Sequence, residues 1–92
     1  MTEEMDLDAL HRRLHKIIGQ CNGIGRMIDR NASCKDIILQ VSAAKNALHK
    51  VGQILLEIYL NDRVKQAMEA GTMEGLSEDF GETIEYFCRM RK

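Results

Sequence analysis

The sequence lacks the residues that shape most β-rich folds. Its 92 residues include no proline, no tryptophan and only four aromatic side chains, two tyrosines and two phenylalanines. Such a composition is not typical of β-sandwiches or β-barrels. With 45% hydrophobic and 29% charged residues, it instead predicts a single all-helical domain over residues 1–92.

Two classes of protein are also disfavoured by what is missing. Three cysteines cannot all pair within one chain, which argues against a small disulfide-stapled secreted protein. No apolar run approaches the roughly 20 residues that cross a bilayer, and the acidic start of the chain is unlike a signal peptide. We therefore expect a cytoplasmic protein with no membrane partner.

Charge is unevenly distributed although the net charge is only −1. Residues 1–10 carry −4, residues 11–50 carry +6 and residues 51–92 carry −3. A basic middle segment favours a polyanionic partner such as DNA, contacted mainly through phosphate and shape. The candidate contacts, which a helical hairpin would bring into one patch, are Arg12, Arg13, Lys16, Lys45 and Lys50. The alternative is a solvated helix face.

Hydrophobic spacing predicts a first helix over about residues 6–30. Its apolar positions follow a heptad seam: Leu7, Leu10, Leu14, Ile17, Cys21, Ile24 and Ile28. Gly19, Gly23 and Gly25 interrupt this helix, and each costs about 1 kcal/mol relative to alanine. They indicate a close approach to another helix or a ligand, or alternatively a bent segment.

A second, much longer helix is predicted over about residues 34–70. Ser33, with Asp36 three residues later, resembles a capping box, and Gly71 is a natural stop. One apolar stripe comprises Ile37, Val41, Ala44, Leu48, Val51, Leu55 and Ile58, and a second comprises Ile38, Ala43, Ala47, Ile54, Leu56, Leu60 and Val64. Because the first helix can cover only one side, we expect the chain to oligomerise.

A short third helix is predicted over about residues 77–91. Ser77 is its expected N-cap, and Glu78 and Asp79 fall in its first turn. Phe80, Ile84 and Phe87 give it an apolar side that would fold back onto the other two helices.

Cys34 is the strongest candidate for chemistry. It is expected in the first turn of the second helix beside Lys35, where the helix dipole and a cation favour a thiolate. Such a position suits a reactive thiol or a soft-metal ligand, or alternatively a packed side chain. Cys21 lies on the heptad seam and is expected to be a small buried hydrophobe. Cys88 is expected to be packed or harmlessly exposed.

A metal site has weaker support in the sequence. His11 and His15 are spaced i, i+4 and could share a metal ion on one helix face, although a solvated basic face is the simpler interpretation. Cys34 and Tyr59 are 25 residues apart on the same helix, which is about 37 Å. A site that combines Cys34 with this distal end or with the N-terminal amine must therefore lie between two antiparallel subunits.

The stretch from Arg13 to Leu60 resembles the CsoR/RcnR/FrmR family of bacterial repressors, which respond to metals, persulfides or formaldehyde. The shared framework is G-Q-x-x-G-I-x-R-M-I, then a cysteine, then D-I-I-x-Q, and the match closes on L-L-E-I-Y-L. The resemblance implies a DNA-binding transcriptional repressor. It also implies antiparallel hairpins paired into a four-helix bundle and assembled as a dimer of dimers, a homotetramer.

The resemblance places Cys34 at the family's sensing cysteine but changes the other ligands. Metal sensors of the family carry histidine where this chain has Tyr59, and cysteine or histidine where it has Arg63. A phenol is a poor soft-metal ligand and a guanidinium is none, so the copper site of the family is incomplete here.

The string E-I-Y-L-N-D most resembles the formaldehyde-responsive branch, although that branch carries histidine where this chain has Tyr59. In that branch formaldehyde links the cysteine to the N-terminal amine of a neighbouring subunit. Removal of Met1 would expose the amine of Thr2, although the proline that begins the chain in that branch is absent. We therefore expect no required cofactor and formaldehyde or a related electrophile as the effector of Cys34. The alternative is a divergent copper or nickel/cobalt sensor using Cys34 with His11, His15 or carboxylates.

The sequence is also compatible with two other classes of protein. An enzyme could use Cys34 as a thiol-transfer nucleophile, but no histidine is placed to act as its base and no substrate pocket is evident, so we expect no enzymatic activity. A coiled-coil adaptor that has lost sensing would keep the helices and bind no DNA.

Overall fold

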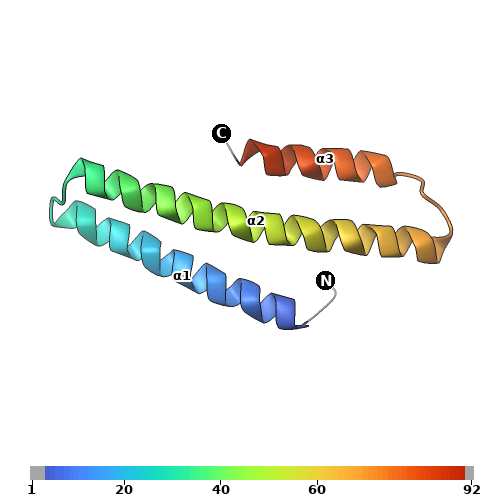
Figure 1. The fold of residues 1–92 in the computed structure, drawn as a ribbon, viewed down its shortest axis with the longest axis horizontal. Helices are drawn as coiled ribbons and strands as arrows, with labels where there is room; N and C mark the ends of the chain where they lie inside the picture. Colours follow the sequence, from blue (N-terminus) through green and yellow to red (C-terminus); the bar gives the residue numbers. More distant parts are fainter. Residues whose placement is uncertain (1–3, 91–92) are drawn as a thin grey trace.

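The chain folds into three antiparallel helices that lie side by side in one layer (Figure 1). The computed structural model describes the backbone of residues 4–90 and the side chains of residues 7–90. The helices are α1 (Glu4–Asp29), α2 (Cys34–Ala70) and α3 (Leu76–Arg89). The central helix α2 packs against α1 along one edge and against α3 along the other. The all-helical prediction is confirmed.

The ends of α2 follow the local signals of the sequence. Ser33 is its N-cap, and the Ser33 side chain accepts a hydrogen bond from the backbone N–H of Asp36 at 3.2 Å. Gly71 ends the helix with φ +71°, a left-handed conformation that glycine adopts without steric cost. The backbone N–H of Gly71 donates to Met68 O at 3.3 Å. Both predicted caps are confirmed.

The third helix begins differently from the prediction. Its N-cap is Gly75, with φ +77°, and no side chain caps the helix. Ser77 lies inside the first turn and is exposed, so its expected capping role was wrong. The left-handed residue that turns the chain back along α2 must precede the helix, and glycine adopts this conformation more readily than serine. The helix ends at Arg89 rather than near residue 91.

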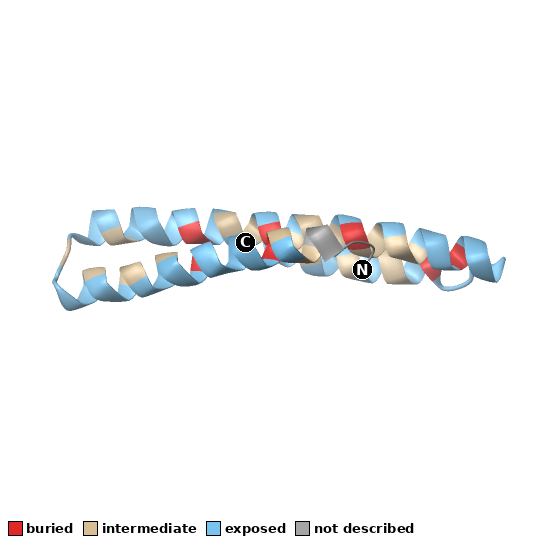
Figure 2. Cartoon of the chain, turned by 90° about the horizontal axis from the view of Figure 1, so that it is seen from below, coloured by how far each residue is buried: buried red, intermediate tan, exposed pale blue. Residues whose placement is uncertain are grey.

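The core lies between α1 and α2 and is thin. Leu10, Ile17, Val51 and Ile58 form its buried cluster, with Ala47 and Ile54 packed against it. No described side chain is less than 2% exposed, and the chain measures 59 × 28 × 13 Å. Seen from below, the buried residues are few and scattered along the helices (Figure 2). One layer of helices leaves both broad faces without cover.

Each heptad seam is therefore only half covered within one chain. On α2, Ala44, Val51 and Ile58 are buried, whereas the alternate members Val41, Leu48 and Leu55 are 42–48% exposed. On α1, the seam shows the same division: the alternate members Leu14 and Ile28 are 40% and 58% exposed. Cys21, on the same outer half, is also exposed, so the expectation that it is buried was wrong. These uncovered apolar halves are the surface that an oligomer would bury.

The glycines of α1 do not mark a close approach within the chain. A Cβ on Gly19 or Gly25 would meet no atom within 4 Å, and one on Gly23 would meet only the Arg26 side chain at 3.7 Å. The expected contact with another helix is therefore absent among the described residues, because α2 packs on the opposite side of α1 from Gly19 and Gly23. Gly52 behaves differently, since a Cβ there would lie 2.7 Å from the Met90 side chain at the end of α3.

The third helix is attached to α2 by polar and aromatic contacts. Arg63 Nη2 lies 2.8 Å from Asp79 Oδ2, and Arg63 Nε donates to the same oxygen at 3.0 Å. Near the other end of α3, the rings of His49 and Phe87 are 4.7 Å apart between centroids. The Arg63 side chain is only 20% exposed, so this pair is partly shielded from solvent.

Replacing Ser33 with alanine should lower the free energy of unfolding by about 1 kcal/mol, because the N-cap hydrogen bond of α2 is lost. The matched variant Ser77→Ala should leave stability almost unchanged, since that serine makes no capping bond. Urea unfolding followed by circular dichroism measures both values. Equal losses in the two variants would contradict the cap assignment.

The Arg63–Asp79 pair should be coupled by about 1 kcal/mol in a double-mutant cycle of Arg63→Met and Asp79→Asn. The control is the Arg89–Glu85 pair, which has a similar separation of 2.9 Å but side chains about 65% exposed. Solvent screening should reduce that coupling to about 0.3–0.5 kcal/mol. Urea unfolding of the wild type and the six variants gives both cycles, and equal couplings would show that the shielded pair has no special role.

Candidate functional site

Cys34 stands at the turn of the hairpin as the first residue of α2. Its side chain is exposed and unpaired with another cysteine, and Lys35 follows it on the exposed surface. The first backbone N–H groups of α2 have no partner within the helix, and the positive end of the helix dipole lies at this terminus. Both features favour an anion there. This environment suits a nucleophilic thiol.

The described residues offer Cys34 no set of metal ligands within the chain. No group of three or more histidine, cysteine, aspartate or glutamate side chains between residues 7 and 90 could hold a metal ion. His11 and His15 are both exposed on α1, outside any such group. Cys88 is also exposed, on α3.

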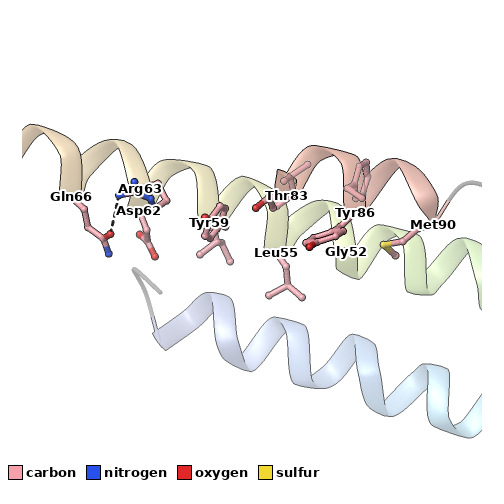
Figure 3. A pocket seen from close by; sticks show the side chains of 12 residues that line it. Gly52, Leu55, Tyr59, Asp62, Arg63, Gln66, Thr83, Tyr86 and Met90 are labelled. Atoms are coloured by element: carbon pink, nitrogen blue, oxygen red, sulfur yellow. Dashed lines mark hydrogen bonds between the residues drawn. The ribbon is translucent and has the colours of Figure 1, made fainter. Parts of the chain in front are cut away.

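Tyr59 and Arg63 lie at the other end of α2, in a groove between α2 and α3 (Figure 3). The groove has a volume of about 630 Å³. Its lining is mainly apolar and comprises Gly52, Leu55, Leu56, Ile58, Tyr59, Asp62, Arg63, Gln66, Thr83, Tyr86, Phe87 and Met90. Tyr59 is half-buried, and the Arg63 side chain lies beside Gln66 at the polar end of this groove.

The guanidinium of Arg63 is fully engaged inside the chain. Besides its two contacts with Asp79, its Nη1 donates to Gln66 Oε1 at 3.3 Å. Arg63 therefore fixes the start of α3 against α2. The hydroxyl of Tyr86, on α3, donates to the Glu82 carboxylate at 2.8 Å, and this hydrogen bond raises the pKa of Tyr86 above its ordinary value of 10.

The structure does not bring Cys34 together with Tyr59 or Arg63. They lie toward opposite ends of one straight helix, and Tyr59 is 25 residues beyond Cys34, or about 37 Å. Thr2, the expected source of an amine, lies outside the described residues. A site that uses Cys34 and the distal end of α2 must combine two copies of the chain.

The candidate DNA contacts fall into two places. Arg12, Arg13 and Lys16 line one shallow hollow on α1 together with Ala9 and His15. Lys45 instead lines a hollow with Asn46, His49 and Met90, next to the end of α3. Lys45 and Lys50 are five residues apart and therefore about 140° apart around α2. The five cations do not form the single contiguous patch that was expected.

The groove was not predicted from the sequence, although Phe87, one of its lining residues, was expected on the apolar side of the third helix. The spacing of Thr83, Phe87 and Met90 at i, i+4 and i+7 was the available signal, because it places them on one side of a helix. The pairing of Arg63 with Asp79 left no signal, since the two residues are joined across a turn whose direction is set by packing.

No helix in the described part of the chain is long and apolar enough to cross a membrane.

Solved structures of two repressors resemble this fold closely. The nickel-responsive transcriptional regulator InrS matches with a TM-score of 0.80 and 28% sequence identity, over 88% of this chain and 91% of that one. The copper-sensing repressor CsoR with Cu(I) from Geobacillus thermodenitrificans NG80-2 matches with a TM-score of 0.83 and 32% identity, over 96% of this chain and 92% of that one.

Curated relatives and a family model agree with these structures. The copper-sensing transcriptional repressor RicR of Mycobacterium tuberculosis is 38% identical over 70% of this chain and 67% of its own length. The copper-sensing transcriptional repressor CsoR of Bacillus subtilis is 32% identical over 92% of this chain and 81% of its own length. These four relatives are named for copper or nickel, and none of them for formaldehyde.

The family model described as metal-sensitive transcriptional repressor matches residues 6–89. Repressors of this kind are not enzymes, so the prediction that the chain has no enzymatic function is confirmed by its relatives. The chain belongs to the metal-sensitive transcriptional repressor family, the CsoR/RcnR family.

Proposed function

We propose that this repressor releases operator DNA when Cys34 reacts with formaldehyde or a related electrophile. The observation that carries the proposal is the chemistry of the positions around the sensing cysteine. Cys34 is an exposed thiol at a helix N-terminus, while the positions where metal sensors of the family carry further ligands hold Tyr59 and Arg63. A nucleophile without metal ligands suits an electrophile better than a metal ion.

The contacts of Arg63 strengthen the argument against a metal at this position. A guanidinium has no lone pair to offer a metal, and here it is also tied to Asp79 and Gln66. The ion pair also occupies the Asp79 carboxylate, so neither member of the pair is available as a ligand in this arrangement.

The uncovered heptad of α2 supports a site shared between subunits. Cys34, Val41, Leu48, Leu55 and Asp62 recur every seven residues, and the three apolar members are 42–48% exposed. If two α2 helices cross antiparallel at Leu48, the register pairs Cys34 with the partner's Asp62. The partner's Tyr59 and the partner's Arg63 then lie within one turn of that pair. This arrangement would place the thiol at the polar end of the groove.

Formaldehyde chemistry accounts for a link at such a site. The thiol of Cys34 adds to the carbon of formaldehyde, and a primary amine then displaces the hydroxyl group as water, leaving an S–CH₂–N bridge. The proposed amine is the N-terminus at Thr2 after removal of Met1, which lies outside the described residues. A covalent bridge between subunits would alter the arrangement of the helices that contact DNA.

DNA contact is proposed through the cations of the hairpin. Arg12, Arg13 and Lys16 lie together on α1, and Lys50 is exposed on α2. Lys45 would contribute only if DNA also reached the side of α2 that carries α3. Contacts with phosphate position a protein on DNA, so these residues set affinity more than sequence preference.

Formaldehyde should release the protein from a duplex that carries the region upstream of its own gene. In a gel-shift titration we expect loss of binding by the wild type. Intact mass spectrometry should then show a covalent dimer that is about 12 Da heavier than two chains for each bridge, the carbon of formaldehyde remaining after water leaves. Cys34→Ala should bind DNA and ignore formaldehyde, whereas Cys21→Ala and Cys88→Ala should respond normally. A responsive Cys34→Ala variant would refute the proposal, and a protein that never binds the duplex would be an adaptor.

A metal sensor is the second candidate, favoured by the copper- and nickel-sensing relatives. In that case Cys34 would bind Cu(I) or Ni(II) with His11, His15 or carboxylates of another subunit. Because the chain lacks the family's other ligands, we expect Cu(I) to bind weakly in competition with a chromophoric chelator. Stoichiometric, tight binding that Cys34→Ser abolishes, with release of DNA, would favour the metal sensor instead.

A further inference from the structure

One stripe along α1 carries basic side chains that neither pack in the core nor form ion pairs within the described residues. It follows the steps 4, 3, 4, 3 and 4 along the helix and consists of Arg12, Lys16, Gly19, Gly23, Arg26 and Arg30. Arg26 is nine residues from the buried Ile17, which places it about 180° around the helix from the core. Arg30 follows the end of α1, and its N–H donates to Arg26 O at 3.1 Å, so it continues the same turn.

The charge of this stripe is not neutralised by its surroundings. All four cations are exposed, and within the described residues none of them forms an ion pair. The only acidic residue among residues 11–30 is Asp29, against five arginine and lysine side chains. An exposed run of one charge sign fits a polyanionic partner.

The middle of the stripe is a notch. Gly19 and Gly23 have no side chains. A Cβ on Gly19 would point into open space, whereas one on Gly23 would lie 3.7 Å from Arg26 Nη2. Both glycines weaken the helix relative to alanine, and no contact within the chain requires them. Lys16 and Arg26 flank the notch ten residues apart, or about 15 Å along the axis. The long basic side chains project on either side of the glycines, so the outer surface of α1 is concave between them.

We propose that this stripe is where the DNA backbone lies against the protein. The convex duplex would approach α1 most closely at Gly19, because the Arg26 side chain lies beside Gly23. Arg26 and Arg30 would then contact phosphates on one side of the notch, as Arg12 and Lys16 do on the other. This inference rests on the proposed DNA-binding function and adds four residues and an orientation of α1 to it.

The notch is tested by filling it without changing charge. Gly19→Gln should raise the melting temperature by a few degrees, because glutamine is the better helix former and nothing within 4 Å opposes it. It should weaken binding to a mixed-sequence duplex of about 40 base pairs by about tenfold or more, because the added side chain separates α1 from phosphate. Gly81→Gln on α3, also in open space, should raise stability and leave DNA binding unchanged.

The cations are tested by the salt dependence of the same binding. Arg26→Gln and Arg30→Gln should each reduce the slope of log K against log salt by about 0.9 for every copy of the residue that contacts a phosphate. Arg89→Gln, which removes a cation from α3, should leave the slope unchanged. Circular dichroism confirms that each variant is folded before it is compared.

The outcomes separate this inference from the repressor function. If the wild type binds the duplex and formaldehyde releases it, while Gly19→Gln and Arg26→Gln bind with unchanged affinity and slope, the repressor function stands and the stripe is refuted. If the wild type binds neither this duplex nor the upstream region, both proposals are overturned. The proposed DNA contact is supported if Gly19→Gln binds the duplex more weakly while its melting curve keeps its shape and moves to a higher midpoint.

Discussion

The rest of the structure depends on a mismatch: α2 is long and has much apolar surface, and the remaining residues are too few to cover it. Helix α2 has 37 residues and apolar positions around most of its circumference. The remaining segments supply two helices, and they pack on opposite edges of α2 rather than around it. A one-layer molecule results, with a thin core and half of each heptad seam exposed. Burial of these halves is the physical reason to expect an oligomer.

The same mismatch limits where the proposed sensing site can lie. A long straight helix keeps Cys34 at one end and the Tyr59–Arg63 groove near the other, so no single chain can join them. The exposed seam runs between these two places, and a second copy that buries the seam in antiparallel fashion would bring them together. In such an arrangement the interaction that stabilises the oligomer also builds the proposed sensing site, which couples effector chemistry to the arrangement of subunits.

The sides of helix α1 differ in character. One side holds the core residues Leu10 and Ile17, the adjacent side carries exposed apolar residues such as Leu14, and the outer side is basic with a glycine notch. Arg63 shows a comparable specialisation on α2. Its guanidinium anchors α3 through Asp79 at the polar end of the groove. A guanidinium has no lone pair to offer a metal ion, so the role that the structure shows for Arg63 is a structural one.

The sequence by itself determined the three helices, both caps of α2 and the family. These features depend on interactions within about four residues, such as the Ser33 cap, or on motifs of fixed spacing. Only the tertiary structure decided that Cys21 is exposed, that Lys45 lies beside the end of α3, and that Arg63 pairs with Asp79. A heptad pattern specifies that a stripe can be buried, but packing between distant segments selects the half that is covered.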